Sequence, residues 1–260
     1  MMNIPCITTG PASGHSHTHT VVFLHGRGDN AQSFATGLDH WRDSRGRNLA
    51  AAFPTFRWVL PQAPVRRLAS SPSQSWPQWF DTWNSRDFTQ NEGLQAAGLR
   101  EVVPVFRRML ADEAALLGDR RDRVVLAGIS MGAATGAHLL FNLAEPIGAF
   151  MGFSGRCPFA GRSLAQMREV LQLDDVPEHS EVLRKTPVLL QHCVDDPLVS
   201  IQTGRGLRDT LRGFGCDVEW KEYPDGGHWF HSPTGMDDAV AFLEKHTMNN
   251  EDHAGGISSR

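Results

Sequence analysis

The chain has 260 residues, of which 40% are hydrophobic and 21% charged, a size and composition typical of one α/β domain with a sizeable core. The 25 Lys and Arg against 29 Asp and Glu residues give a formal net charge of −4, which excludes the strong positive charge of a nucleic-acid-binding protein. No run approaches the roughly 18 apolar residues of a membrane-spanning helix. The four cysteines are scattered, which argues against a disulfide framework or structural zinc site and favours a cytoplasmic location.

The composition of the two ends differs from that of the middle. Residues 1–19 are rich in Gly, Ser, His and Thr and lack the charged start and apolar run of a secretory signal. We expect a flexible N-terminal segment over 1–19, one α/β domain over 20–246 and a disordered tail over 247–260. His15, His17 and His19 alternate near the start, but without further fixed ligands they do not predict a metal site.

Between the ends, short apolar runs alternate with longer amphipathic patterns, which is typical of a mainly parallel central sheet with helices on both faces. The predicted strands are 20–24, 57–60, 124–127, 148–153, 187–191 and 217–221. The predicted helices are 93–117, 133–141, 203–214 and 236–246. Pro104 is expected to kink the first of these or to mark a restart. The Gly-, Pro- and Ser-rich stretches 61–77 and 153–163 predict long loops along a substrate site.

The stretch Gly128-Ile129-Ser130-Met131-Gly132 lies between the apolar strand 124–127 and the small-residue helix 133–141. A direct strand-to-helix turn strains the backbone of the residue at its tip, and glycines on both sides let neighbouring backbone pass closely. Such a turn exposes a serine hydroxyl. The pattern therefore predicts that Ser130 is the nucleophile of a serine hydrolase.

A serine nucleophile needs a histidine to accept its proton and a carboxylate to orient that histidine. In the α/β-hydrolase order, serine, acid and histidine follow one another along the chain. Asp196 follows the strand 187–191, and His228 follows the strand 217–221 on a glycine-containing loop. We predict the triad Ser130, Asp196 and His228. The other candidates are Asp195 and Asp81 for the acid, and His192, His231, His246 and His253 for the base.

The oxyanion of the tetrahedral intermediate needs two backbone N–H donors. We expect one from Met131, directly after the nucleophile, and one from Arg27 in the glycine-containing loop after the strand 20–24. Two aromatic clusters, around residues 76–83 and 229–230, are either core or an apolar wall for an acyl chain. The predicted substrate contacts are Trp76, Trp79, Trp229 and Leu198.

Four motifs in the same order resemble the acyl-protein thioesterase/carboxylesterase family of the α/β-hydrolase superfamily. They are Phe23-Leu24-His25-Gly26-x-Gly28-Asp29, Trp79-Phe80-Asp81, Gly128-x-Ser130-x-Gly132-Ala133 and His192-x-x-x-Asp196-Pro197-Leu198-Val199. The resemblance covers about residues 20–246. It implies a cytoplasmic serine hydrolase that cleaves acyl esters or thioesters with no metal or organic cofactor.

Aligned on the family pattern, the nucleophile, acid and base are again Ser130, Asp196 and His228. The chain departs from the pattern near the site: Arg27 stands where leucine is usual, Met131 replaces glutamine, Ala133 replaces the second glycine, and Val194 replaces the first aspartate of HGDxD. Because Arg27 and Met131 are expected to line the site, the resemblance leaves the choice of substrate open.

The function predicted from these residues is cleavage of an ester or thioester in an acylated small molecule or lipidated protein, through an acyl-enzyme. A small-metabolite carboxylesterase or lysophospholipase is the alternative within the same chemistry, and an acyltransferase would use the same intermediate. From another class, a non-catalytic binding module with a hydrolase fold remains as an alternative. No nucleic acid partner and no transmembrane segment are expected, and the sequence gives no oligomeric state.

Overall fold

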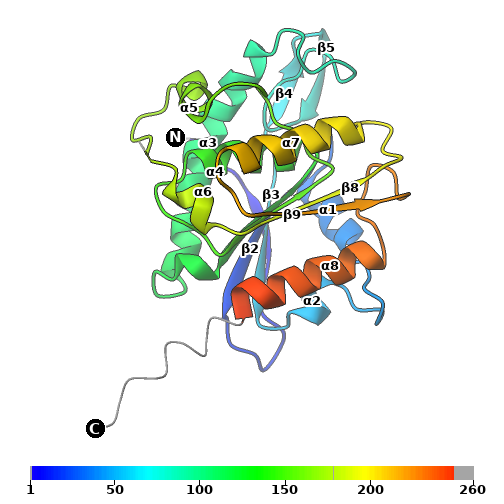
Figure 1. Cartoon of the computed structure of the whole chain (residues 1–260). Coiled ribbons are helices and arrows are strands. Elements are labelled where there is room, and N and C mark those ends of the chain that lie inside the picture. Colours follow the sequence, from blue (N-terminus) through cyan, green and yellow to red (C-terminus); the bar gives the residue numbers. More distant parts are fainter. Residues whose placement is uncertain (1, 178, 249–260) are drawn as a thin grey trace.

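The computed structural model describes residues 2–177 and 179–248 (Figure 1). Their centre is a seven-stranded sheet in the order β1-β3-β2-β6-β7-β8-β9. All neighbouring strands run parallel except β1, which is antiparallel to β3. The strands are β1 (Cys6–Thr9), β2 (His19–Leu24), β3 (Phe56–Pro61), β6 (Val124–Ile129), β7 (Ala149–Phe153), β8 (Val188–Cys193) and β9 (Val218–Tyr223). This mainly parallel sheet confirms the predicted α/β-hydrolase fold class.

Helices cover both faces of the sheet (Figure 1). Along β2, Val22 and Leu24 pack into one apolar core, while Val21 and Phe23 pack into the other, as the two-residue period of a strand requires. The first core is closed by α3 (Gly93–Ala115), α4 (Met131–Phe141), α5 (Leu164–Leu171), α6 (Glu181–Lys185) and α7 (Ile201–Gly213). The second is closed by α1 (Ala31–Leu38), α2 (Leu49–Ala52) and α8 (Thr234–Leu243).

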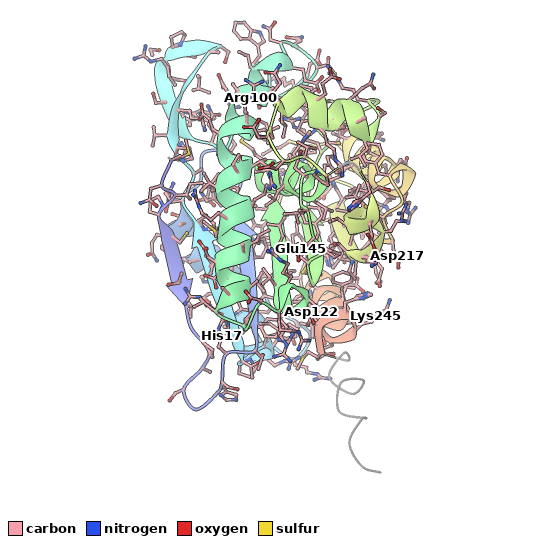
Figure 2. All side chains as sticks on the ribbon, turned by 90° about the vertical axis from the view of Figure 1, so that its left-hand side faces the viewer. His17, Arg100, Asp122, Glu145, Asp217 and Lys245 are labelled. Atoms are coloured by element: carbon pink, nitrogen blue, oxygen red, sulfur yellow. The ribbon has the colours of Figure 1, made fainter. Side chains whose placement is uncertain are left out.

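The long helix α3 runs without interruption through Pro104, so the expected restart there is wrong. Pro104 is exposed, and its missing N–H leaves a backbone carbonyl unbonded on the solvent side, where water can replace the hydrogen bond. Figure 2 shows Arg100 on α3, next to α5. Its Nε donates to the Leu171 carbonyl over 2.8 Å and so ties the two helices together. None of the described helices is both long and apolar enough to cross a membrane.

The first 19 residues contain regular structure rather than forming a flexible segment throughout. Cys6–Thr9 form the edge strand β1, paired with residues 58–61 of β3. His19 begins β2, is buried, and bonds through Nε2 to the Thr247 carbonyl over 3.0 Å. Thr247 is itself buried in a single π-helical turn, Glu244–Met248, that follows α8. Residues 247 and 248 are therefore helical rather than part of the expected tail, and the rest of that segment, 249–260, lies outside the described part of the chain.

The stretch 61–77 forms a hairpin rather than a loop. Its strands, β4 (Val65–Leu68) and β5 (Ser71–Pro77), pair antiparallel and project beyond the central sheet (Figure 1). The second expected loop, 153–163, follows β7 without helix or strand and ends at the capping box of α5, where the Ser163 side chain accepts from Gln166 N. Both connections contribute residues to the cleft described next.

Candidate active site

Ser130 occupies a sharp turn between β6 and α4. The strand ends at Ile129 and the helix begins at Met131, so a single residue reverses the chain direction. Ser130 has φ 57° and ψ −118°, a conformation that L-residues rarely adopt and that is sustained only when the surroundings fix it. Its N–H donates to the Phe153 carbonyl over 2.8 Å, which anchors the turn to the neighbouring strand.

The two flanking glycines are required by close backbone contacts. A Cβ on Gly128 would lie 2.4 Å from the backbone carbon of Gly132, and a Cβ on Gly132 would lie 2.2 Å from the Leu24 carbonyl oxygen. Both positions are therefore closed to any side chain. This agrees with the backbone approach expected from the glycine pattern around Ser130.

Asp196 and His228 come from loops after β8 and β9 and form a hydrogen-bonded pair. His228 Nδ1 donates to Asp196 Oδ2 over 2.7 Å. The other carboxylate oxygen accepts from the backbone N–H groups of Leu198 and Val199, each over 2.9 Å. Burial alone would raise the pKa of Asp196, but the hydrogen bonds from His192, His228 and Val199 outweigh it and hold the pKa well below its ordinary value. The carboxylate is therefore ionised at neutral pH.

The two competing acids have structural roles. Asp195 Oδ1 accepts from the backbone N–H of Gly227 over 2.8 Å and so holds the loop that carries His228. Asp81 accepts from the backbone N–H groups of Ala69 and Thr82 over 2.7 and 2.8 Å, which fixes the end of the hairpin.

The competing histidines lie in other settings. His192 is buried and its Nε2 donates to the Val199 carbonyl over 2.8 Å, with Asp196 Oδ2 3.3 Å away. His231 stacks on Tyr223 with ring centroids 4.4 Å apart. His246 bonds to Glu219 over 3.3 Å. His253 lies outside the described residues.

Ser130, Asp196 and His228 line one cleft of about 870 Å³. Trp76, Leu198 and Trp229 also line it and remain 41%, 62% and 37% exposed. Trp79 does not belong with them: it is fully buried, and its Nε1 donates to the His25 carbonyl over 2.8 Å. The structure therefore places Trp79 in the core rather than among the predicted substrate contacts.

Known proteins share the sequence pattern of this chain over most of its length. The sequence pattern of the phospholipase/carboxylesterase family matches residues 11–247. The chain belongs to the phospholipase/carboxylesterase family. As a member of it, the chain is a hydrolase of the ester-cleaving kind.

Individual relatives are distant but cover most of the chain. Acyl-protein thioesterase 1 of Gibberella zeae is 28% identical over 233 residues, which are 88% of this chain and 91% of that protein. A "probable inactive carboxylesterase" of Oryza sativa subsp. japonica is 29% identical over 208 residues, 80% of this chain and 77% of its own. The crystal structure of acyl-protein thioesterase 2 of Zea mays superposes with a TM-score of 0.72 at 23% identity, covering 94% and 99% of the two chains.

In this family member, the loop after β2 packs directly against the nucleophile. A Cβ on Gly26 would lie 3.4 Å from Ser130 Cβ. Gly28 has φ +81° and donates its N–H to the Pro77 carbonyl over 2.8 Å, which ties the loop to the hairpin. Arg27 lies between these two glycines and lines the cleft, as does Met131. The two residues predicted for the oxyanion hole thus lie in the same cleft as Ser130.

Several cleft residues of this hydrolase were not predicted from the sequence, and one of them is a buried arginine. Arg156, in the segment after β7, lines the cleft although only 5% of it is exposed. A single arginine in an irregular segment gives no periodic pattern from which its burial could be predicted. The only available signal was that the loop 153–163 was expected to lie along the substrate site. Among the residues with described positions, no cluster of three or more His, Cys, Asp or Glu side chains is arranged to hold a metal ion.

Proposed function

We propose that this family member hydrolyses carboxylic esters and thioesters through an acyl-enzyme formed on Ser130. The observation that carries the proposal is the 2.7 Å bond between His228 Nδ1 and Asp196 Oδ2, in the cleft that Ser130 also lines. Because Asp196 accepts the Nδ1 proton, the neutral imidazole keeps Nε2 free to act as a base. The rice relative carries the word inactive in its name, whereas an active enzyme is proposed here because Ser130, Asp196 and His228 line the same cleft.

In the acylation step, Ser130 Oγ attacks the carbonyl carbon while His228 Nε2 takes its proton. The carbonyl oxygen becomes an oxyanion as the Oγ–C bond forms. Asp196 remains ionised and stabilises the imidazolium through the bond to Nδ1. When the tetrahedral intermediate collapses, the alcohol or thiol leaves with the proton from His228, and the acyl group stays on Ser130.

The backbone N–H groups of Arg27 and Met131 are the proposed oxyanion donors. Support comes from the position of Met131 at the first turn of α4 and from the contact of the Gly26 loop with Ser130. The positive end of a helix favours a negative charge there. A donor of this kind typically contributes about 3 kcal/mol of transition-state stabilisation.

Deacylation repeats the chemistry with water. His228 takes a proton from the water as it attacks the acyl carbon, and the second tetrahedral intermediate collapses with return of that proton to Ser130 Oγ. The free acid then leaves. No metal or organic cofactor enters the proposed reaction.

The exposed side chains of Trp76, Trp229 and Leu198 are the proposed apolar contacts of the acyl chain. Each buried methylene contributes about 0.8 kcal/mol. The name of the Gibberella relative, an acyl-protein thioesterase, favours thioesters among the substrates. We therefore propose acylated small molecules or lipidated proteins of the cytoplasm as the substrate range.

Matched oxyester and thioester series of increasing acyl length test this function, with Ser130→Ala as the control. We expect turnover of both bond types by the wild type, and an increase in kcat/KM with chain length if the exposed aromatic side chains hold the acyl group. Turnover confined to short oxyesters would instead identify a small-metabolite carboxylesterase. Equal activity of Ser130→Ala would contradict the proposal.

A further inference from the structure

Two buried or half-buried arginines, Arg27 and Arg156, line the cleft together with Ser130. Arg27 belongs to the loop after β2, and Arg156 belongs to the segment after β7. Arg86, which is exposed, lines the same cleft. An ester site that bound only apolar acyl chains would have no use for this concentration of positive charge.

The guanidinium of Arg156 is held by one hydrogen bond and two aromatic rings among the described residues. Its Nη2 donates to Gln95 Oε1 over 2.7 Å, and the Gln95 amide in turn donates to the Phe88 carbonyl over 3.0 Å. The guanidinium carbon lies 4.1 and 5.4 Å from the ring centroids of Phe88 and Phe80. These contacts orient the planar group, but the bond to Gln95 uses one of its five N–H donors.

Arg27 is held in a similar way. Its Nε donates to Gln78 Oε1 over 2.9 Å, and its guanidinium carbon lies 4.9 Å from the ring centroid of Trp76. In the part of the chain that the structure describes, neither Arg27 nor Arg156 forms an ion pair with a carboxylate. Both arginines are therefore oriented by neutral amides and aromatic rings rather than by a directly paired carboxylate.

The two charges act on each other. Burial lowers the pKa of Arg156 to about 10, with Glu92 and Cys157 opposing the change and Arg27 adding to it. Burial also lowers the pKa of Arg27, against the charge of Asp81. Both side chains nevertheless remain protonated at neutral pH. A buried charge without a partner is costly, and a bound anion would offset that cost.

The acidic groups near the cleft are already engaged. Asp196 accepts hydrogen bonds from His228 and two backbone N–H groups. Asp29, which also lines the cleft, accepts from the Asn30 N–H over 2.8 Å. Glu92 accepts from the Phe159 N–H over 2.6 Å. Glu92 and Asp81 act on the two arginines only from a distance, so among the described residues an anionic ligand would be their direct charged partner.

We propose that Arg156 and Arg27 bind an anionic group, a carboxylate or a phosphate, on the substrate whose ester bond Ser130 attacks. The planar fork of arginine matches both groups through paired N–H donors. This inference rests on the proposed ester hydrolysis and narrows its substrates to anionic acyl esters. It also assigns a role to Arg27, which stands where the motif of the resembling family has leucine.

Two pairs of esters that differ only in a carboxylate against a methyl group test the proposal. Ethyl hydrogen glutarate and ethyl pentanoate place the difference on the acyl side. The acetate ester of 4-hydroxybutyrate and butyl acetate place it on the alcohol side. We expect kcat/KM to favour the anionic member of at least one pair by about 10- to 100-fold, the range typical of a charged hydrogen bond. Equal rates within both pairs would overturn the proposal.

Arg156→Gln keeps the size and polarity of the side chain and removes its charge. We expect it to reduce kcat/KM for the favoured anionic ester about 10-fold more than for its neutral partner. The matched control is Arg45→Gln, which removes an equal charge from an exposed loop residue outside the cleft. If Arg156→Gln and Arg45→Gln lost the preference for the anionic ester equally, the preference would arise from the net charge of the protein. That result would contradict a specific anion site. Thermal unfolding shows whether each variant is folded.

Binding to the Ser130→Ala protein separates this proposal from the proposed function, because that variant binds without turning over. Titration calorimetry with glutarate and with inorganic phosphate should show binding that Arg156→Gln, introduced into the same protein, weakens about 10-fold or more. The ion that binds with the lower Kd shows whether the site prefers a carboxylate or a phosphate. Failure of ester hydrolysis with anion binding intact would refute only the proposed reaction. Binding of neither ion would refute the anion site.

Discussion

The carboxylate of Asp196 has its hydrogen-bond partners in place without substrate. Two backbone N–H groups, from Leu198 and Val199, hold one oxygen, and His228 Nδ1 donates to the other. Because the hydrogen bonds from His192, His228 and Val199 lower the pKa of the carboxyl group, acid does not protonate it until well below its ordinary range. Loss of activity on mild acidification would therefore not be due to protonation of Asp196.

We predict that Asp196→Asn lowers kcat by about 10⁴-fold, because an amide in place of the carboxylate neither stabilises the imidazolium nor fixes the reactive tautomer. Steady-state turnover of a short-chain ester checks the effect. Asp195→Asn is the matched control, since it changes the neighbouring residue, which holds only the backbone N–H of Gly227. A larger loss in Asp195→Asn than in Asp196→Asn would reverse the assignment of the acid.

At the scale of single residues, chain order and local motif led to the proposed triad, whose three members line one cleft. Ser130 follows from its flanking glycines, and Asp196 and His228 from loops at the ends of successive strands. The role of Trp79 could not be predicted, because an aromatic residue in a loop motif packs equally well in a core or a cleft. Arg156 was missed because its burial depends on Phe88 and Gln95, which lie more than 60 residues away.

At the scale of elements, α7 packs against β8, the strand that precedes Asp196. A Cβ on Gly204 would lie 2.2 Å from Nδ1 of His192, a buried ring already bonded to the Val199 carbonyl. Gly206, one half-turn further, has nothing within 4 Å of its Cβ position. The close contact lets the helix approach β8 and support His192, which is 3.3 Å from Asp196.

We predict opposite effects for alanine at these two glycines. Gly204→Ala should destabilise the fold by about 1–3 kcal/mol through overpacking and should lower turnover by displacing His192. Gly206→Ala should stabilise it by about 0.5–1 kcal/mol, since alanine favours the helix interior. Urea unfolding and ester turnover of both variants measure the effects. Equal stability of the two variants would show that α7 does not press on His192.

Most of the central elements could be predicted from apolar periodicity. The six predicted strands correspond to β2, β3, β6, β7, β8 and β9, and the four predicted helices to α3, α4, α7 and α8. The edge strand Cys6–Thr9 and the hairpin of β4 and β5 were missed, because short, exposed, polar strands carry no apolar alternation. The predicted restart at Pro104 was wrong because this proline is exposed, so water can replace the helix hydrogen bond that it removes.

At the scale of the whole molecule, residues from distant parts of the chain meet at the carboxyl ends of the parallel strands. Loops after β2, β6, β7, β8 and β9 all contribute to the one cleft. This follows from parallel topology, which places the ends of successive strands at the same edge of the sheet. The two apolar cores pack on the two faces of the sheet that carries this edge.

The central claim is that Ser130 is a nucleophile activated by His228 and Asp196. Labelling with a fluorophosphonate, followed by peptide mass mapping, tests it most directly because the reagent reacts with activated serine. We predict a single adduct on Ser130 in the wild type, none in Ser130→Ala, and labelling in Asp196→Asn slower by several orders of magnitude. An adduct on another residue, or undiminished labelling of Ser130→Ala, would contradict the account.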